Sequence, residues 1–217
     1  MKALLLAGGR STRMGTPKHL LPMPDGRPIY QHLVDTLHAA CPEADDVYIS
    51  LAQESLLDDR LRHAALPGNN TESKQTRRPT LRILYDARGN NTTDSAGPAA
   101  GLLATHRAHP DATWLVVGCD YPFVTVEALS QLREMHAGPV TCFRNDEGFC
   151  EPLVGIWGPK ALERLAENDA KGRSGPSAVV RELDGLTIRP NGACSTKVLC
   201  NVNTPQEWEA AQGILTR

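Results

Sequence analysis

The sequence predicts an α/β fold with three layers (α/β/α), in which helices cover both faces of a mainly parallel, Rossmann-like twisted sheet. Strand patterns and helix patterns alternate along the chain, as they do in proteins with parallel sheets. The strand segments, such as residues 113–118, are almost continuously apolar, which is typical of strands buried on both faces. Short segments rich in charge or glycine follow several of these strands, where ligands bind in such folds.

The first half of the chain alternates between strand and helix patterns and ends in a polar segment. Strands are predicted at residues 2–7, 46–51 and 80–85, and helices at 28–40 and 53–66. In the first helix Ile29, Leu33 and Leu37 recur at helical spacing, and Pro28 suits the first turn. Residues 67–79 combine glycine, asparagine and a basic run, which predicts a flexible insertion.

The second half continues the alternation without an internal repeat. Strands are predicted at residues 113–118, 140–143 and 197–202, and helices at 98–108, 126–136, 160–166, 177–183 and 205–214. A chain of 217 residues is long enough for one sizeable core. We therefore expect a single domain over residues 1–217.

Composition narrows the classes of partner. The formal net charge is −2, so no basic excess indicates nucleic acid. No run of 18 apolar residues and no secretory signal are present, which argues against a membrane partner. The six cysteines form no C-x-x-C pair and are typical of reduced thiols in a cytoplasmic protein. We expect a monomer or a weak homo-oligomer.

The most informative segment is residues 6–18, LAGGRSTRMGTPK, which follows the first strand. Its glycine spacing fits neither a Walker A loop nor a dinucleotide-binding fingerprint. Gly8 and Gly9 nevertheless allow the backbone to approach a ligand with its N–H groups. Arg13 and Lys18 add a forked cation and a point charge suited to phosphate oxygens. The segment predicts a phosphate-binding loop, with an ordinary charged surface turn as the alternative.

A second chemical group follows the strongly apolar strand at 113–118. There the sequence GCDYP places Asp120 directly after the strand. A carboxylate in that position suits Mg²⁺, a hard cation that keeps several waters and needs few protein ligands. The alternative is a structural role for Asp120 as a cap of the turn before Pro122 or of the helix near Thr125. The residues alone leave both interpretations open.

The opening segment resembles the signature loop of the molybdenum cofactor guanylyltransferases, a MobA-like family of nucleotidyltransferases. GPAAG at 97–101, GCDYP at 118–122 and NVNTP at 201–205 resemble further segments of that family. The resemblance implies a nucleotide-diphospho-sugar transferase type of fold. It also implies Mg²⁺-dependent transfer of GMP from GTP to a phosphorylated acceptor, the molybdopterin of molybdenum cofactor, with release of pyrophosphate.

The resemblance also implies roles for individual residues. The catalytic set is Arg13, Lys18 and Asp120, in which the two cations neutralise the triphosphate and Asp120 holds Mg²⁺. Asn203 is the candidate second metal ligand, with a turn or N-cap as its other role. The nucleotide-binding set is Leu6, Ala7, Gly8, Gly9, Lys18, Asp86 and Asp120.

Two further acidic residues, Asp94 and Glu151, can be matched to the family in more than one way. Asp94 is the alternative to Asp86 as the aspartate that contacts the nucleotide, because the polar stretch after residue 87 leaves open which of the two matches the family's position. The segment EPL at 151–153 resembles the part of the family that faces the second substrate. For Glu151, a solvated residue at the start of a strand is the favoured interpretation.

The choice of base rests on two conflicting features. Gly8 and Gly9 together resemble the guanylyl branch, whereas Pro17 before Lys18 is more similar to cytidylyl relatives. Cytidylyl transfer and sugar-phosphate nucleotidylyl transfer are therefore alternatives with the same fold. A non-catalytic nucleotide-binding protein is the alternative of a different class.

Overall fold

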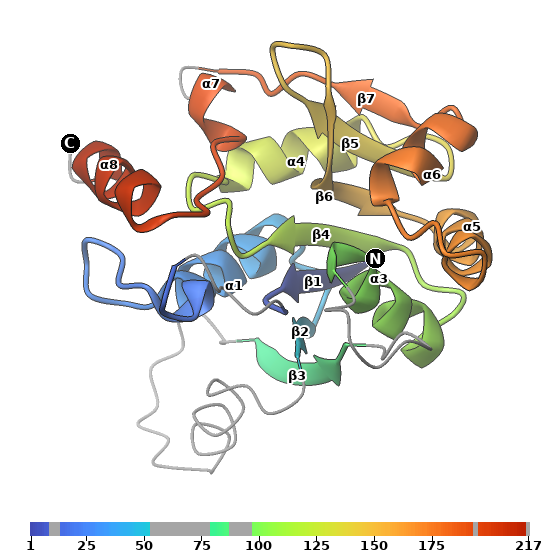
Figure 1. Ribbon diagram of the computed structural model, residues 1–217, viewed down its shortest axis with the longest axis horizontal. Coiled ribbons are helices and arrows are strands. Elements are labelled where there is room, and N and C mark those ends of the chain that lie inside the picture. Colours follow the sequence, from blue (N-terminus) through green and yellow to red (C-terminus); the bar gives the residue numbers. More distant parts are fainter. Residues whose placement is uncertain (9–13, 53–78, 87–96, 193–194, 216–217) are drawn as a thin grey trace.

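The computed structural model describes residues 1–8, 14–52, 79–86, 97–192 and 195–215. In this part of the chain one sheet has seven strands in the order β3-β2-β1-β4-β6-β5-β7 (Figure 1). The strands are β1 Lys2–Leu6, β2 Asp46–Leu51, β3 Thr80–Tyr85, β4 Trp114–Gly118, β5 Val140–Arg144, β6 Cys150–Trp157 and β7 Leu186–Ile188. The predicted helix at 53–66 and all but the last residue of the predicted insertion at 67–79 lie outside the described residues.

The predicted mainly parallel sheet is confirmed. Strands β3, β2, β1 and β4 pair in parallel, and β5 pairs in parallel with β7. Strand β6 is antiparallel to both of its neighbours, β4 and β5. As a result the start of β6, and not its end, lies at the same edge of the sheet as the end of β4.

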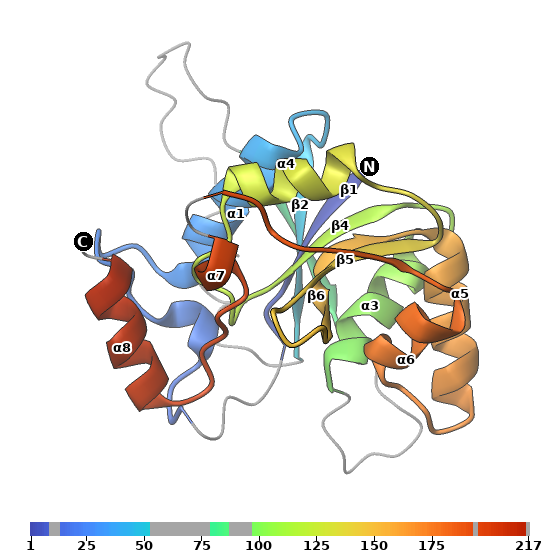
Figure 2. The same cartoon turned by 90° about the horizontal axis from the view of Figure 1, so that it is seen from above.

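Helices cover both faces of the sheet, which confirms the three-layer arrangement (Figure 2). Helices α1 (Ile29–Ala40) and α4 (Val126–Glu134) pack together on one face. Helices α3 (Gly97–Ala108), α5 (Pro159–Ala170) and α6 (Pro176–Glu182) cover the other face.

Each face has its own apolar core. Leu5 and Val117 join the core beneath α1 and α4, whereas Leu4 and Val116 join the core beneath α3 and α5. All four side chains are fully buried, because neighbouring residues of a central strand alternate between two covered faces. This explains the continuous apolar runs in the sequence.

The predicted strand at 197–202 is wrong. The structure has a short helix, α7 (Ser195–Val198), followed by irregular backbone up to the last helix, α8 (Pro205–Leu215). Val198 and Val202 are buried against the core beneath α1 and α4, so their apolar character reflects packing and not strand pairing.

No range was predicted for strands β6 and β7, although Glu151 was interpreted as a residue at the start of a strand. Pro152 and Gly155 interrupt the strand pattern of β6, and β7 has only three residues. Gly155 is required where it stands, because a Cβ there would lie 2.6 Å from the carbonyl oxygen of Thr141. Among the described helices, none has the length and apolar character needed to cross a membrane.

Candidate active site

The predicted site residues come together at one edge of the sheet. Strands β1, β3 and β4 end there, and they are followed by Ala7, Asp86 and Cys119 respectively. A backbone hydrogen bond continues the pairing by one residue beyond the end of each of these strands. Ala7 N donates to Ser50 O at 2.9 Å, Asp86 N donates to Leu51 O at 2.8 Å, and Cys119 N donates to Leu6 O at 2.9 Å. Leu6 and Ala7 are buried at this edge. Gly9, Arg13 and Asp94 lie outside the described residues.

Lys18, Asp120 and Asn203 form the centre of the site. Lys18 Nζ donates a hydrogen bond of 2.6 Å to Asn203 Oδ1. The same ammonium group lies 3.9 Å from Asp120 Oδ2, and the two side chains keep only 15% and 22% of their exposure. A cation and two oxygen-bearing side chains from distant parts of the chain therefore share one partly buried place.

The turn after β4 fixes the Asp120 carboxylate. Gly118 is needed there, because a Cβ at that position would lie 2.7 Å from Asp120 Oδ1. Burial raises the pKa of Asp120, and the charge of Lys18 partly opposes that rise. Thr125 and not Asp120 caps α4, since its side chain accepts from Ala128 N at 3.2 Å. The alternative role of Asp120 as a helix cap is therefore wrong.

The start of α8 fixes Asn203 in a similar way. Thr204 and Glu207 form a capping box: Glu207 N donates to Thr204 Oγ1 at 3.2 Å, and Thr204 N donates to Glu207 Oε2 at 3.1 Å. Glu207 Oε2 also accepts from Asn203 N at 2.6 Å. Because Thr204 serves as the cap, the Asn203 side chain is available to Lys18. The backbone just before Asn203 is also tied to Asp120, the candidate metal ligand, because Val202 N donates to Asp120 O at 2.8 Å.

The segment that carries Lys18 begins with a short 3₁₀ helix, η1 (Lys18–Leu20). Within it His19 is buried, and its ring hydrogen-bonds to the backbone of Ala7 at the end of β1. Burial lowers the pKa of His19 to about 4, and the bond to Ala7 opposes this. His19 is therefore neutral at physiological pH, and the positive charge of η1 comes from Lys18.

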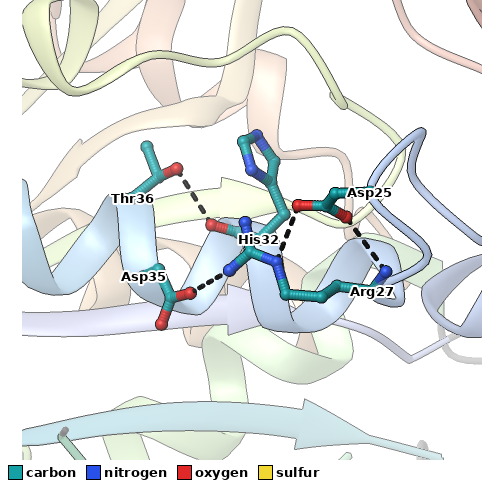
Figure 3. Close-up of polar contacts among 5 residues, drawn as sticks. All are labelled: Asp25, Arg27, His32, Asp35 and Thr36. Carbon is teal, nitrogen blue, oxygen red and sulfur yellow. Dashed lines mark hydrogen bonds and ion pairs between the residues drawn. The ribbon is translucent and has the colours of Figure 1, made fainter. Parts of the chain in front are cut away.

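A surface network fastens the following turn to helix α1 (Figure 3). Arg27 donates from Nε to Asp25 Oδ2 and from Nη1 to Asp35 Oδ2, each at 2.7 Å. His32 lies between these groups on α1, and burial is the main cause of its lowered pKa. The ion pairs are exposed and add little stability, but they orient the chain between η1 and α1.

Asp86 lies beside Gly8, the last described residue before the opening loop. Its carboxylate accepts a short hydrogen bond from Ser50 Oγ. It also lies directly against Gly8, where any Cβ would overlap with Asp86 Oδ2. Burial raises the pKa of Asp86, and the bond from Ser50 opposes that rise. Gly101 in α3 makes room for the same group, because a Cβ there would lie 2.7 Å from Ser50 Oγ.

Tyr121 and Glu151 extend the site towards β6. Tyr121 Oη donates to Glu151 Oε2 at 2.8 Å. Glu151 is the second residue of β6, which confirms its predicted place at the start of a strand, but it is half-buried and hydrogen-bonded and so is not fully solvated. Sequence reasoning did not identify Tyr121. Its position directly after Asp120 was visible, but its partner on β6 was not, because β6 itself was missed.

The donor atoms at the centre fit a hard divalent cation. Asp120 supplies a carboxylate and Asn203 an amide oxygen, the ligand types that Mg²⁺ prefers. The partly buried Asp120 carboxylate has one nearby cation, Lys18, in the part of the chain that is described. No group of three histidine, cysteine, aspartate or glutamate residues suited to a metal occurs among the described residues. Waters and phosphate oxygens would therefore have to complete the coordination of Mg²⁺.

Solved structures of other proteins have the same fold as this chain. The structure of molybdopterin-guanine dinucleotide biosynthesis protein A from Archaeoglobus fulgidus superposes with a TM-score of 0.69 and 18% sequence identity. The superposition covers 100% of this chain and 99% of that one. The likeness shows that the two chains share one fold.

Comparison with sequences gives the family. The model of the MobA-like NTP transferase domain matches residues 3–186, so the chain belongs to the MobA-like NTP transferase family. It is 32% identical to a probable molybdenum cofactor guanylyltransferase of Rhodopirellula baltica, over 94% of this chain and 88% of that protein. It is 27% identical to a molybdenum cofactor biosynthesis bifunctional protein of Synechocystis, over 94% of this chain. The chain spans about half, 52%, of that protein's length.

Proposed function

We propose that the protein is a Mg²⁺-dependent guanylyltransferase that moves GMP from GTP to the terminal phosphate of molybdopterin in molybdenum cofactor and releases pyrophosphate. The observation that carries the proposal is the meeting of Lys18, Asp120 and Asn203 at the strand edge. The names of the relatives support the choice of donor and acceptor.

The chemistry requires positioning and charge neutralisation more than a strong base. The attacking phosphate of the acceptor is already anionic, so no side chain has to remove a proton. Lys18 and Arg13 neutralise the triphosphate and the departing pyrophosphate. Asp120 and Asn203 hold Mg²⁺, which supplies Lewis-acid stabilisation of phosphate oxygens when bound. Buried, pre-oriented charges act strongly in such a reaction, because they need no reorganisation as charge develops.

Asp86 favours guanine as the base. An ionised carboxylate accepts hydrogen bonds and cannot donate them. Guanine presents two adjacent donors, N1–H and the 2-amino group, whereas cytosine presents one donor, its 4-amino group, beside the acceptor N3. The Asp86 carboxylate lies against Gly8 of the nucleotide-binding loop, where it can accept from such donors. Cytidylyl transfer remains the second candidate, because Pro17 precedes Lys18 as in cytidylyl relatives.

Pyrophosphate release tests the proposal directly. The purified protein is incubated with Mg²⁺, isolated molybdenum cofactor and GTP or CTP, and release is measured with each nucleotide. We expect release with GTP, loss of release in Asp120→Asn, and no loss in Asp111→Asn, an exposed residue that precedes β4 at the opposite edge of the sheet. Release with CTP alone would favour the cytidylyl reaction. Release by Asp120→Asn at the wild-type rate would contradict the metal assignment.

A further inference from the structure

A buried hydroxyl group lies in an apolar strand at the edge of the sheet that carries the candidate site. Ser50 is the next-to-last residue of β2, where it pairs with Leu6 of β1 and Leu84 of β3, and its side chain is fully buried. A buried hydroxyl group without a hydrogen-bond partner destabilises a fold. Ser50 Oγ has a partner, because it donates a short hydrogen bond to Asp86 Oδ1. The strand therefore presents one polar side chain to the candidate nucleotide-binding aspartate.

Helix α3 confines this hydroxyl group from the other side. The helix approaches β2 at Gly101, where a Cβ would lie 2.7 Å from Ser50 Oγ and 3.1 Å from Ser50 Cβ. The contact is so close that only glycine fits at position 101, and the Ser50 side chain has little room to move towards the helix. Ser50 is thus fixed between β2 and α3, with its hydroxyl group directed at Asp86.

The two oxygen atoms of the Asp86 carboxylate have different surroundings. Oδ1 accepts the hydrogen bond from Ser50. Oδ2 is the oxygen nearer to Gly8, because a Cβ built on Gly8 would overlap with Oδ2 but would lie 3.0 Å from Oδ1. Gly8 is the last described residue before the opening loop. One oxygen is therefore used within the protein, and the other lies over the backbone that leads into that loop.

Ser50 also favours the ionised form of Asp86. Burial raises the pKa of Asp86, and the hydrogen bond from Ser50 opposes this rise. The groups that the structure places against the carboxylate are the Ser50 hydroxyl group from β2 and Gly8 after β1, and α3 reaches Ser50 through Gly101. None of these groups is charged. Because only the ionised carboxylate is purely an acceptor, the hydroxyl group of Ser50 helps to keep Asp86 in the form that accepts hydrogen bonds.

We propose that Ser50 is a positioning residue for base selection, which holds Asp86 through Oδ1 so that Oδ2 accepts a hydrogen bond from an N–H group of the nucleotide base. The inference rests on the proposed function, because it concerns the nucleotide side of that same site. Ser50 is fully buried and acts through Asp86, not by contact with the nucleotide. A base with adjacent N–H donors on one edge, as guanine has, fits an acceptor held in this way.

Binding of GTP in the absence of an acceptor tests this role. In Ser50→Ala we expect the Kd for GTP at pH 7, measured by titration calorimetry with Mg²⁺, to rise about tenfold, the scale known for hydrogen-bonded partners of metal ligands. The Kd for CTP should change less, because cytosine lacks the adjacent donors. Thr36→Val is the matched control. Thr36 is also buried, and its hydroxyl group donates to His32 O at 2.9 Å within α1, on the other face of the sheet.

The pH dependence of GTP binding separates positioning from a loss of packing. Because the bond from Ser50 lowers the pKa of Asp86, its removal raises that pKa. On acidification, GTP binding should therefore weaken from a higher pH in Ser50→Ala than in the wild type. In the Asp86→Asn background, Ser50→Ala should no longer shift the pH profile, since no carboxyl group remains to respond. A packing defect alone would lower the affinity equally at every pH.

The outcomes distinguish this inference from the proposed function. If the wild type binds neither nucleotide, or prefers CTP, the proposed guanylyl transfer fails and the base-selecting role fails with it. If the wild type prefers GTP but Ser50→Ala has the same Kd and the same pH profile, the positioning role is overturned and the proposed function is unaffected. A shifted profile that persists in the Asp86→Asn background would also overturn it, because Ser50 would then act through another group.

Discussion

Lys18 Nζ lies 2.6 Å from Asn203 Oδ1, although the two residues are 185 positions apart in the chain. Lys18 follows the first strand, whereas Asn203 precedes the last helix, α8. Both side chains meet above the end of β4, where Asp120 lies 3.9 Å from the same ammonium group. The lysine that we propose to bind phosphate and the candidate metal ligands therefore depend on contacts between the two ends of the chain. Changes at either end should affect the same reaction.

Replacement of Lys18 by alanine should lower kcat/KM for GTP by roughly 10²–10³, the effect of removing one pre-oriented charge-stabilising group. Lys18→Arg should restore only part of the activity, because a planar guanidinium group cannot replace a compact ammonium group between Asp120 and Asn203. Steady-state pyrophosphate release at varied GTP concentration measures both effects. Lys171→Ala, at an exposed lysine just after α5, serves as the control. Equal losses in Lys171→Ala and Lys18→Ala would show that the effect is not specific to the site.

The capping box at the start of α8 should influence activity although it contributes no ligand. In Glu207→Ala the backbone N–H groups of Asn203 and Thr204 lose their common acceptor. We expect a loss of about 1 kcal/mol in the free energy of unfolding, the usual cost of a lost cap. We also expect a higher Mg²⁺ concentration for half-maximal activity, because Asn203 is less firmly held.

Urea unfolding and a Mg²⁺ titration of pyrophosphate release measure these two effects. Glu209→Ala is the control, since Glu209 is an exposed residue of the same helix. If Glu207→Ala loses stability but keeps the wild-type dependence on Mg²⁺, the capping box is purely structural.

Asp86→Asn should stabilise the protein while it weakens nucleotide binding. Burial raises the pKa of Asp86 above the value of 3.8 that an unperturbed aspartate has. The folded state therefore binds this proton more tightly than the unfolded state. The contribution of Asp86 to the stability of the fold therefore falls as pH rises from its pKa in the unfolded chain through its pKa in the folded protein. The loss persists at neutral pH. Asparagine removes the charge and still offers an oxygen to Ser50.

We expect the midpoint temperature of Asp86→Asn at pH 7 to be roughly 2–4 °C higher than that of the wild type, which corresponds to about 1 kcal/mol in a chain of this size. The difference should shrink as pH falls towards the pKa of an unfolded aspartate. Calorimetry across this pH range tests whether Asp86→Asn raises the midpoint temperature, with Asp111→Asn as an exposed control. A destabilised Asp86→Asn at neutral pH would contradict the assigned cause.

The sequence was sufficient for the parts of the site that are local. The loop after β1 and the aspartate after β4 were visible because an apolar strand ends abruptly in chemically distinctive residues. The structure also brings Asn203 to the same place as Lys18 and Asp120, although the strand predicted before it is a helix and irregular backbone. Its placement depends on a capping box and on the backbone of Asp120, and both are independent of strand pairing.

Long-range pairing limited the prediction of the structure around β6. Strand β6 carries Pro152 and Gly155, so its local pattern is weak, and its antiparallel direction is a property of the whole sheet. Without that direction, Glu151 could not be placed beside Tyr121. The hydrogen bond between them joins residues 30 positions apart, and neither residue indicates the other by its local sequence.

Two glycines in helices should respond to alanine with opposite signs. Gly101 lies in α3, where a Cβ would overlap with Leu6 Cδ2 and lie 2.7 Å from Ser50 Oγ, and both neighbours are buried. Overpacking of this kind costs about 1–3 kcal/mol. Gly213 in α8 has no atom within 4 Å of a built Cβ. There alanine should add roughly 0.5–1 kcal/mol, because it loses less backbone entropy than glycine on folding.

Urea unfolding of Gly101→Ala and Gly213→Ala measures the pair under the same conditions. The intrinsic gain of alanine in a helix is common to both, so the difference between the two variants reports the close approach of α3 to β1 and β2. Because Ser50 also donates to Asp86, Gly101→Ala should raise the KM for GTP as well, whereas Gly213→Ala should leave it unchanged. A Gly101→Ala protein as stable as Gly213→Ala would mean that Leu6 and Ser50 can move aside, and the tight packing of α3 against β1 and β2 would then not be required.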